Sequence, residues 1–190
     1  MPSISFENSG QYLDALERNP ALALATLDMA QDICGVGRAT VDKMLREDVL
    51  TCVEIAGVRH VLAADLRARM LRYRDQVTKV RLILEQLARK QTTTFYEPVM
   101  SPVGLSWRVP RDRTLVGQIL GDISEQTHQE VAADGQSGVL LSVLVHKKTT
   151  GVTRPGEGFF NLAASLGYEW EDPDAFVQEQ TTRVFAYYAA

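Results

Sequence analysis

The feature that most constrains this chain is a pair of short helical patterns joined by glycine, between residues 26 and 46. Apolar residues repeat at helical spacing on each side of the glycines; they are Met29, Ala30 and Ile33, then Val41, Met44 and Leu45. Gly35 suits the left-handed turn that closes a helix, and a second helix is expected over residues 37–46. Two short helices joined by a tight turn predict a helix-turn-helix, whose second helix enters the major groove of DNA.

The flanking segments extend this pattern. Before it, a helix is expected from Tyr12 until Asn19-Pro20, and a second short helix over residues 21–25. After it, residues 50–55 and 58–62 read as two strands of a hairpin that turns at Ala56-Gly57. A further helix opens at Ala64.

The order of helix, turn, helix, hairpin and helix resembles the excisionase and MerR-type winged helix-turn-helix family. The matching residues are Gly35-Val36-Gly37-Arg38-Ala39-Thr40-Val41 and Val53-Glu54-Ile55-Ala56-Gly57-Val58-Arg59-His60-Val61-Leu62-Ala63-Ala64-Asp65-Leu66. The resemblance covers about residues 26–70 and implies a DNA-binding protein of the transcription-regulator type. The residues that it implies at the DNA are Arg38, Ala39, Thr40, Lys43 and Arg46 of the helix and Arg59 and His60 of the wing.

Acidic residues within this module favour a different use of it. Asp42 stands beside Lys43, and Glu47-Asp48 follow the second helix. Neutralisation of phosphates by basic side chains supplies most non-specific DNA affinity, so a DNA-reading helix is normally more basic. The alternative is an adaptor for structure or assembly, which uses the winged helix for protein interaction.

A long helix is expected to connect the two halves over residues 67–90. Its apolar positions alternate by four and three; they are Leu66, Met70, Tyr73, Val77, Val80, Leu84 and Leu87. Such a seam suits a coiled coil, and a homodimer would pair DNA half-sites. However, Leu71, Leu82 and Ile83 widen the stripe, as in a helix that packs into a core.

Net charge differs between the halves. Residues 1–90 carry 13 Lys and Arg against 12 Asp and Glu, a net of +1, whereas residues 91–190 carry 7 against 12, a net of −5. The total of −4 therefore hides a near-neutral module and an acidic one. Either each half has its own partner, including a protein partner for the acidic half, or the two halves attract each other.

The second half predicts a small α+β domain over residues 91–190, so that the whole chain is α+β with a winged module over residues 1–66. After a linker at 91–94, strands are expected over 95–100, 105–109 and 138–145. The expected helices cover residues 115–123, 125–132 and 159–166, with a last one that starts at Asp172-Pro173. Gly117 and Gly121 lie four apart, which predicts close backbone packing on one helix face. We assign this half a role in dimerisation, partner binding or ligand sensing.

A ligand or anion site is a further possibility in residues 138–160, where a glycine-bearing loop joins the expected strand to a helix N-terminus. Its candidate residues are His146, Lys147, Lys148, Arg154, Gly156 and Gly158. The loop lacks the Lys-Ser/Thr of a P-loop, and no histidine and carboxylate spacing supports a catalytic triad. An enzyme that acts on nucleic acid at this site is therefore a lesser alternative, with Asp112, Asp122 and Glu125 as loose candidates for Mg²⁺ ligands.

Other kinds of site find little support in the sequence. Cys34 and Cys52 show no metal-ligand spacing and read as reduced core thiols. We expect no metal site, no cofactor and no catalytic residue. The chain shows neither a signal-peptide pattern nor an apolar run long enough to span a bilayer, which predicts a cytoplasmic protein with no membrane partner.

Overall fold

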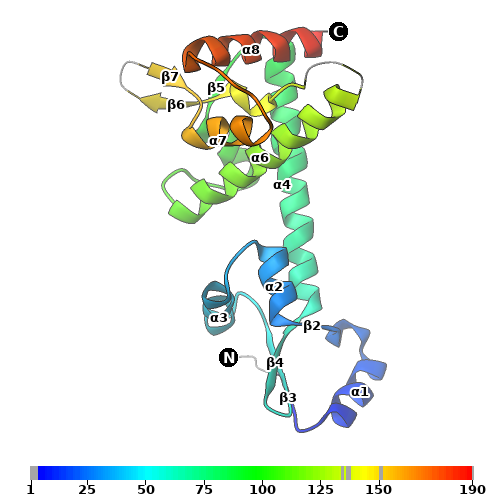
Figure 1. The fold of residues 1–190 in the computed structure, drawn as a ribbon. Coiled ribbons are helices and arrows are strands. Elements are labelled where there is room, and N and C mark those ends of the chain that lie inside the picture. The colour runs from blue at the N-terminus through cyan, green and yellow to red at the C-terminus, as the bar shows by residue number, and fades with distance from the viewer. Residues whose placement is uncertain (1–3, 134, 136–137, 150–151, 190) are drawn as a thin grey trace. The chain divides into compact units, whose positions relative to one another are not determined.

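The computed structural model describes residues 4–133, 135, 138–149 and 152–189. The fold is mixed α+β with small sheets (Figure 1). It separates into two compact units, residues 1–74 and residues 75–190. The division lies inside helix α4 (Ala63–Arg89), so this helix contributes to both units.

The first unit contains a four-stranded sheet in the order β1-β3-β4-β2. Its strands are β1 (Ile4–Phe6), β2 (Leu24–Ala25), β3 (Cys52–Ile55) and β4 (Val58–Leu62). The expected hairpin β3–β4 is present, and its turn residues Ala56 and Gly57 have φ of 48° and 80°. Positive φ at both central residues matches the twist of a two-residue hairpin turn, which explains the glycine. β1 pairs parallel with β3, an element that the sequence patterns did not indicate.

The helices of this unit are α1 (Ser9–Arg18), α2 (Leu27–Cys34) and α3 (Arg38–Arg46). The Thr26 hydroxyl accepts the Met29 N–H at 3.1 Å and caps α2, which ends at Gly35 with φ of 61°. The helix expected over residues 21–25 is wrong. A 3₁₀ turn (Pro20–Leu22) is followed by β2, because Leu24 and Ala25 pair with Leu62 and Val61 of β4.

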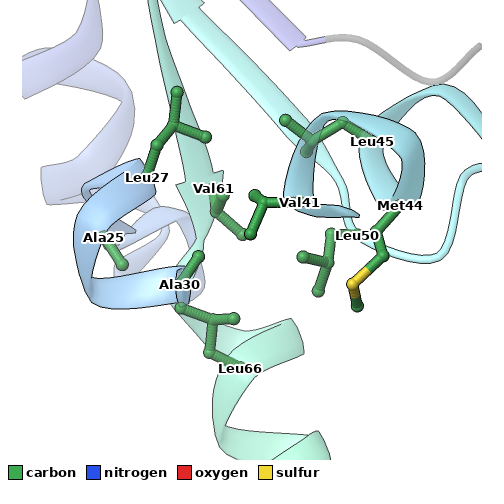
Figure 2. Packing of buried hydrophobic residues seen from close by; sticks show 9 residues of the cluster. All are labelled: Ala25, Leu27, Ala30, Val41, Met44, Leu45, Leu50, Val61 and Leu66. Atoms are coloured by element: carbon green, nitrogen blue, oxygen red, sulfur yellow. The ribbon is translucent and has the colours of Figure 1, made fainter. Parts of the chain in front are cut away.

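The core of the first unit lies where α2, α3 and the sheet meet the start of α4. Figure 2 shows its buried members, which come from each of these segments: Ala25, Leu27, Ala30, Val41, Met44, Leu45, Leu50, Val61 and Leu66. The inward face predicted for α3 is confirmed, because Val41, Met44 and Leu45 are all buried. Burying such side chains stabilises the unit by roughly 1.5–3 kcal/mol each.

The long helix α4 uses its apolar stripe within the chain. Leu66, Val80 and Leu84 of the expected coiled-coil seam are buried in the single chain. Leu71 and Leu82, which were expected to widen the buried stripe, are instead 54 % and 52 % exposed. Three seam positions are therefore already covered without a second copy.

The second unit contains the rest of α4 and the helices α5 (Tyr96–Met100), α6 (Pro110–Ala133), α7 (Glu157–Ser165) and α8 (Pro173–Ala189). Its sheet has the order β5-β6-β7, formed by β5 (Thr94–Phe95), β6 (Val145–Thr149) and β7 (Val152–Arg154). The last two expected helices are confirmed closely. The two helices expected over 115–132 form one helix, α6.

Three strand predictions in this unit are wrong, for a common reason. The segment 95–100 is a strand only at its first residue and then becomes α5, whose Glu97 carboxylate accepts the Trp107 N–H. Residues 105–109 form no strand and turn at 107–109, and the Ser106 N–H likewise donates to the Asp112 carboxylate. Side-chain carboxylates thus accept hydrogen bonds from backbone N–H groups that would otherwise donate to a neighbouring strand.

The backbone of the apolar run 138–145 likewise hydrogen bonds with side chains, rather than with a neighbouring strand, at Val139 and Ser142. It is extended at first, then forms a 3₁₀ helix, η3 (Leu141–Leu144), and enters β6 only at Val145. Thr127 Oγ1 donates to the Val139 carbonyl, and Ser142 N–H donates to Ser124 Oγ, both at 3.0 Å. Buried backbone groups must be paired, and here α6 side chains pair them. The expected loop before α7 is in part the strand β7.

Candidate functional site

The exposed side of α3 carries the residues expected at DNA. Arg38, Ala39, Thr40, Lys43 and Arg46 are all exposed, while the opposite side of the helix is buried. The N-cap residue of the helix is Gly37, which offers no side-chain cap. The amphipathic spacing therefore presents a continuous polar strip of small and basic side chains.

Asp42 brings α3 and the hairpin together. Its carboxylate lies 3.1 Å from Arg59 Nη2 of β4 and 3.6 Å from Arg38 Nε on the same helix. Arg38 also lies 3.9 Å from Asp28 of α2. The structure thus gathers Arg38 and Arg59, two of the predicted residues, around one carboxylate.

The other predicted residues differ in their surroundings. Lys43 lies 3.7 Å from Glu47, one helical turn away, whereas Arg46 makes no ion pair within the described part of the chain. His60 follows Arg59 on β4 and pairs with the buried Val53 of β3, so it lies on the other face of the sheet. Its Nδ1 hydrogen bonds with the Val58 carbonyl at 3.1 Å. His60 is therefore not brought to the side of α3.

The residues proposed for an anion site in the second unit do not converge. His146 is buried and its Nε2–H donates to the Val143 carbonyl at 3.0 Å. Desolvation lowers the pKa of His146, so it is neutral at pH 7 rather than a cation. Arg154 faces Asp174 at 3.6 Å and packs over the Phe160 ring. Lys148 is exposed and lies opposite Thr153 in the ladder.

Lys147 and Gly156 do lie together, with Tyr96. A Cβ on Gly156 would stand 2.9 Å from both Lys147 Cε and the Tyr96 hydroxyl oxygen. The Gly156 backbone hydrogen bonds with that oxygen, and desolvation raises the pKa of Tyr96. A methyl group at Gly156 would displace the Lys147 side chain or the Tyr96 hydroxyl group.

A pocket of about 160 Å³ opens beside this point, within the second unit. Residues from α5, α6, η3, β6, α7 and the segment between β7 and α7 line it: Tyr96, Gly117, Leu120, Gly121, Ser142, Val145, Pro155, Gly158, Phe159 and Leu162. Of the expected ligand-site residues, Gly158 belongs to the lining. The close packing predicted at Gly117 and Gly121 is wrong, because a Cβ at either would meet nothing within 4 Å. Their spacing four apart was the available signal for this pocket.

Metal ligands do not gather among the residues that the structure describes. Asp112 is buried and accepts the Ser106 N–H, and it stands ten residues before Asp122 on α6, roughly 15 Å along the axis. Cys34 and Cys52 are free and half-buried, and desolvation raises the pKa of each thiol.

No described helix combines the length and apolar character needed to cross a membrane. Comparisons of the chain with protein-family models, with curated proteins and with solved structures found no match.

Proposed function

We propose that the first unit is a winged helix-turn-helix that binds double-stranded DNA, with α3 in the major groove. The observation that carries the proposal is the exposed side of α3, which combines Arg38, Lys43 and Arg46 with the small residues Ala39 and Thr40. Nine residues span roughly 13 Å, and the major groove, about 12 Å wide, admits a helix of this kind. Small side chains let the helix axis approach the bases while the longer basic ones reach phosphates.

The hairpin supports the proposal through Arg59. The ion pair between Arg59 and Asp42 links β4 to α3, so a cation of the wing lies beside the helix that would enter the groove. Phosphate contacts fix orientation while base contacts give specificity. We assign Arg59 and the basic side chains of α3 to the first role, and the small residues Ala39 and Thr40 to the second.

A second candidate, a protein-interaction adaptor, draws support from the same ion pairs. Arg38, Lys43 and Arg59 each face a carboxylate within the unit. Apolar side chains are also exposed around the module, at Met29, Val49 and Val58. Partly neutralised cations next to exposed apolar residues would suit a protein partner better than a phosphate backbone.

The experiment measures binding to a mixed-sequence DNA duplex over a range of salt concentrations. The double variant Arg38→Ala/Lys43→Ala should bind about tenfold more weakly, with a salt slope smaller by about 2, because each lost phosphate contact removes about one released counterion. Arg18→Ala is the matched control, since it removes an exposed cation from α1.

Equal losses in the double variant and in the control would refute the proposal, as would an absence of salt-dependent binding by the intact protein. In that case, a stable hetero-complex that Met29→Ser disrupts would favour the adaptor.

A further inference from the structure

The pocket in the second unit has the dimensions of a ligand site. Its volume is about 160 Å³, and an apolar cavity of about 150 Å³ accepts benzene. Protein interiors contain few voids larger than a water molecule. We propose that this pocket binds a small carboxylate whose apolar part is about the size of a benzene ring.

Glycines keep the pocket open. Gly117 and Gly121 lie one turn apart on α6, and Gly158 lies on α7. Glycine inside a helix lowers its stability relative to alanine, yet a Cβ at any of these positions would meet nothing within 4 Å. Neither close packing nor a positive φ requires glycine here. Because these three glycines have no side chains, space is left in the pocket.

A buried hydroxyl group supplies the polar element of the site. Ser142 is 6 % exposed and lines the pocket. Its Oγ accepts the Ser124 hydroxyl at 2.7 Å, and its backbone N–H donates to Ser124 Oγ at 3.0 Å. The Ser142 hydroxyl proton is thus left without an acceptor among the described residues. A buried donor of this kind favours a ligand that brings an acceptor.

Tyr96 offers a second donor. Its oxygen takes the Gly156 backbone hydrogen bond, so its own hydroxyl proton can be donated to a ligand. The lining residues include several apolar side chains, with Leu120, Val145, Phe159 and Leu162 among them, and no carboxylate. A lining that combines two hydroxyl groups with apolar side chains matches one carboxylate on an apolar body.

Charge near the pocket selects a carboxylate over a neutral carbonyl. Lys147 is exposed, and its side chain and the Tyr96 hydroxyl adjoin the same point at Gly156. Hydrogen bonds to an ionised acceptor are roughly twice as strong as those between neutral groups. Lys147 would strengthen this preference through its charge without entering the pocket.

The test is an NMR titration of the full chain with benzoate, and with toluene as the neutral probe of similar size. Benzoate should shift the backbone amide signals of Gly117, Gly121 and Gly158 saturably, while those of Gly104 and Gly167, outside the lining, stay in place. Tyr96→Phe should weaken benzoate binding about tenfold and leave toluene binding unchanged, because it removes one hydrogen bond to the charged carboxylate.

A pocket-filling variant tests the location. Gly121→Leu should abolish binding of both probes, whereas Gln118→Leu, on an exposed position of the same helix, should retain it. If Gly121→Leu fails to fold by circular dichroism, the Tyr96→Phe comparison decides.

Three results would overturn the proposal. One is an absence of saturable shifts up to about 10 mM benzoate, the weakest affinity expected for a ligand of this size. Another is equal shifts at the lining and control glycines. The third is equal binding of toluene and benzoate with no effect of Tyr96→Phe.

Discussion

The Arg59 guanidinium of β4 lies 3.1 Å from the Asp42 carboxylate of α3, which Arg38 also approaches at 3.6 Å. One carboxylate thus holds two of the cations that we propose to contact the phosphate backbone of DNA. Asp42 is 29 % exposed on its side chain, so this competition takes place partly shielded from solvent. The arrangement predicts that Asp42 limits DNA affinity.

Asp42→Asn should strengthen DNA binding several-fold and steepen its salt dependence, because Arg38 and Arg59 are released for phosphates. The measurement is fluorescence anisotropy of a labelled duplex at several salt concentrations. The unit should lose less than about 1 kcal/mol of stability, as is usual for pairs near the surface. Asp14→Asn makes the same charge change on α1, and equal effects of the two variants would contradict the prediction.

Gly138→Ala should destabilise the second unit by about 1–3 kcal/mol. A Cβ at this position would stand 2.2 Å from His128 Nδ1, which itself hydrogen bonds with the Tyr168 hydroxyl at 2.9 Å. Urea denaturation measures the loss. Gly117→Ala is the control and should instead stabilise α6 by up to about 1 kcal/mol, so a neutral Gly138→Ala would show that the His128 ring moves freely.

Arg81 and Glu130 should show a stability coupling that depends on pH. Two hydrogen bonds of 2.8 and 2.6 Å join them, and Arg81 lowers the pKa of Glu130. A lowered folded-state pKa adds stability that is present above the ordinary value of 4.5 and is lost as pH falls through the folded value. Because Glu130 is 49 % exposed, a double-mutant cycle with Arg81→Gln and Glu130→Gln should give only about 0.5–1 kcal/mol at pH 7.

A coupling that persists unchanged at pH 3, or that is absent at pH 7, would contradict this expectation. Measurements in high salt should reduce the coupling moderately, because the pair is partly open to solvent.

The raised pKa of Tyr188 should lower the stability of the second unit in alkaline solution. Desolvation, followed by the charge of Glu85, raises its pKa from 10.0 to about 12. Between these values the unfolded chain has lost the Tyr188 proton while the folded chain retains it. The free energy of unfolding therefore falls as pH rises, with a slope that corresponds to at most about one bound proton. Tyr188→Phe should show a shallower decline in urea-denaturation stability from pH 10 to 12, and identical profiles for both proteins would contradict the assignment.

Local patterns predicted the elements of residues 26–62 well, because these helices follow apolar spacing and glycine turns. Residues 26–62 gave two helices and a hairpin with nearly the observed bounds. The sequence could not indicate β1, whose three residues become a strand only through pairing with β3. In the second unit, Ser124 and Thr127 bind the backbone of residues 139–142, and no local pattern reveals that a helix side chain will replace a strand neighbour.

The candidate sites were predictable to a similar degree. Helical spacing placed Arg38 and Lys43 on the exposed side of α3, as observed. The ion pair of Asp42 with Arg59 joins residues 17 positions apart and follows from the fold rather than the spacing. The pocket brings together Tyr96, Gly121 and Phe159, which share no local motif. Sequence patterns give little information about sites whose residues come from distant segments of the chain.

The order β1-β3-β4-β2 has a consequence for any attempt to isolate the module that we propose binds DNA. Both outer strands of the sheet come from residues 4–25, ahead of the segment that resembles known winged modules. A fragment limited to residues 26–70 would leave the hairpin with bare hydrogen-bonding groups along both of its sides, and such unprotected edges promote aggregation. Residues 4–25 therefore protect both edges of the hairpin, and an isolated fragment of the module must include them.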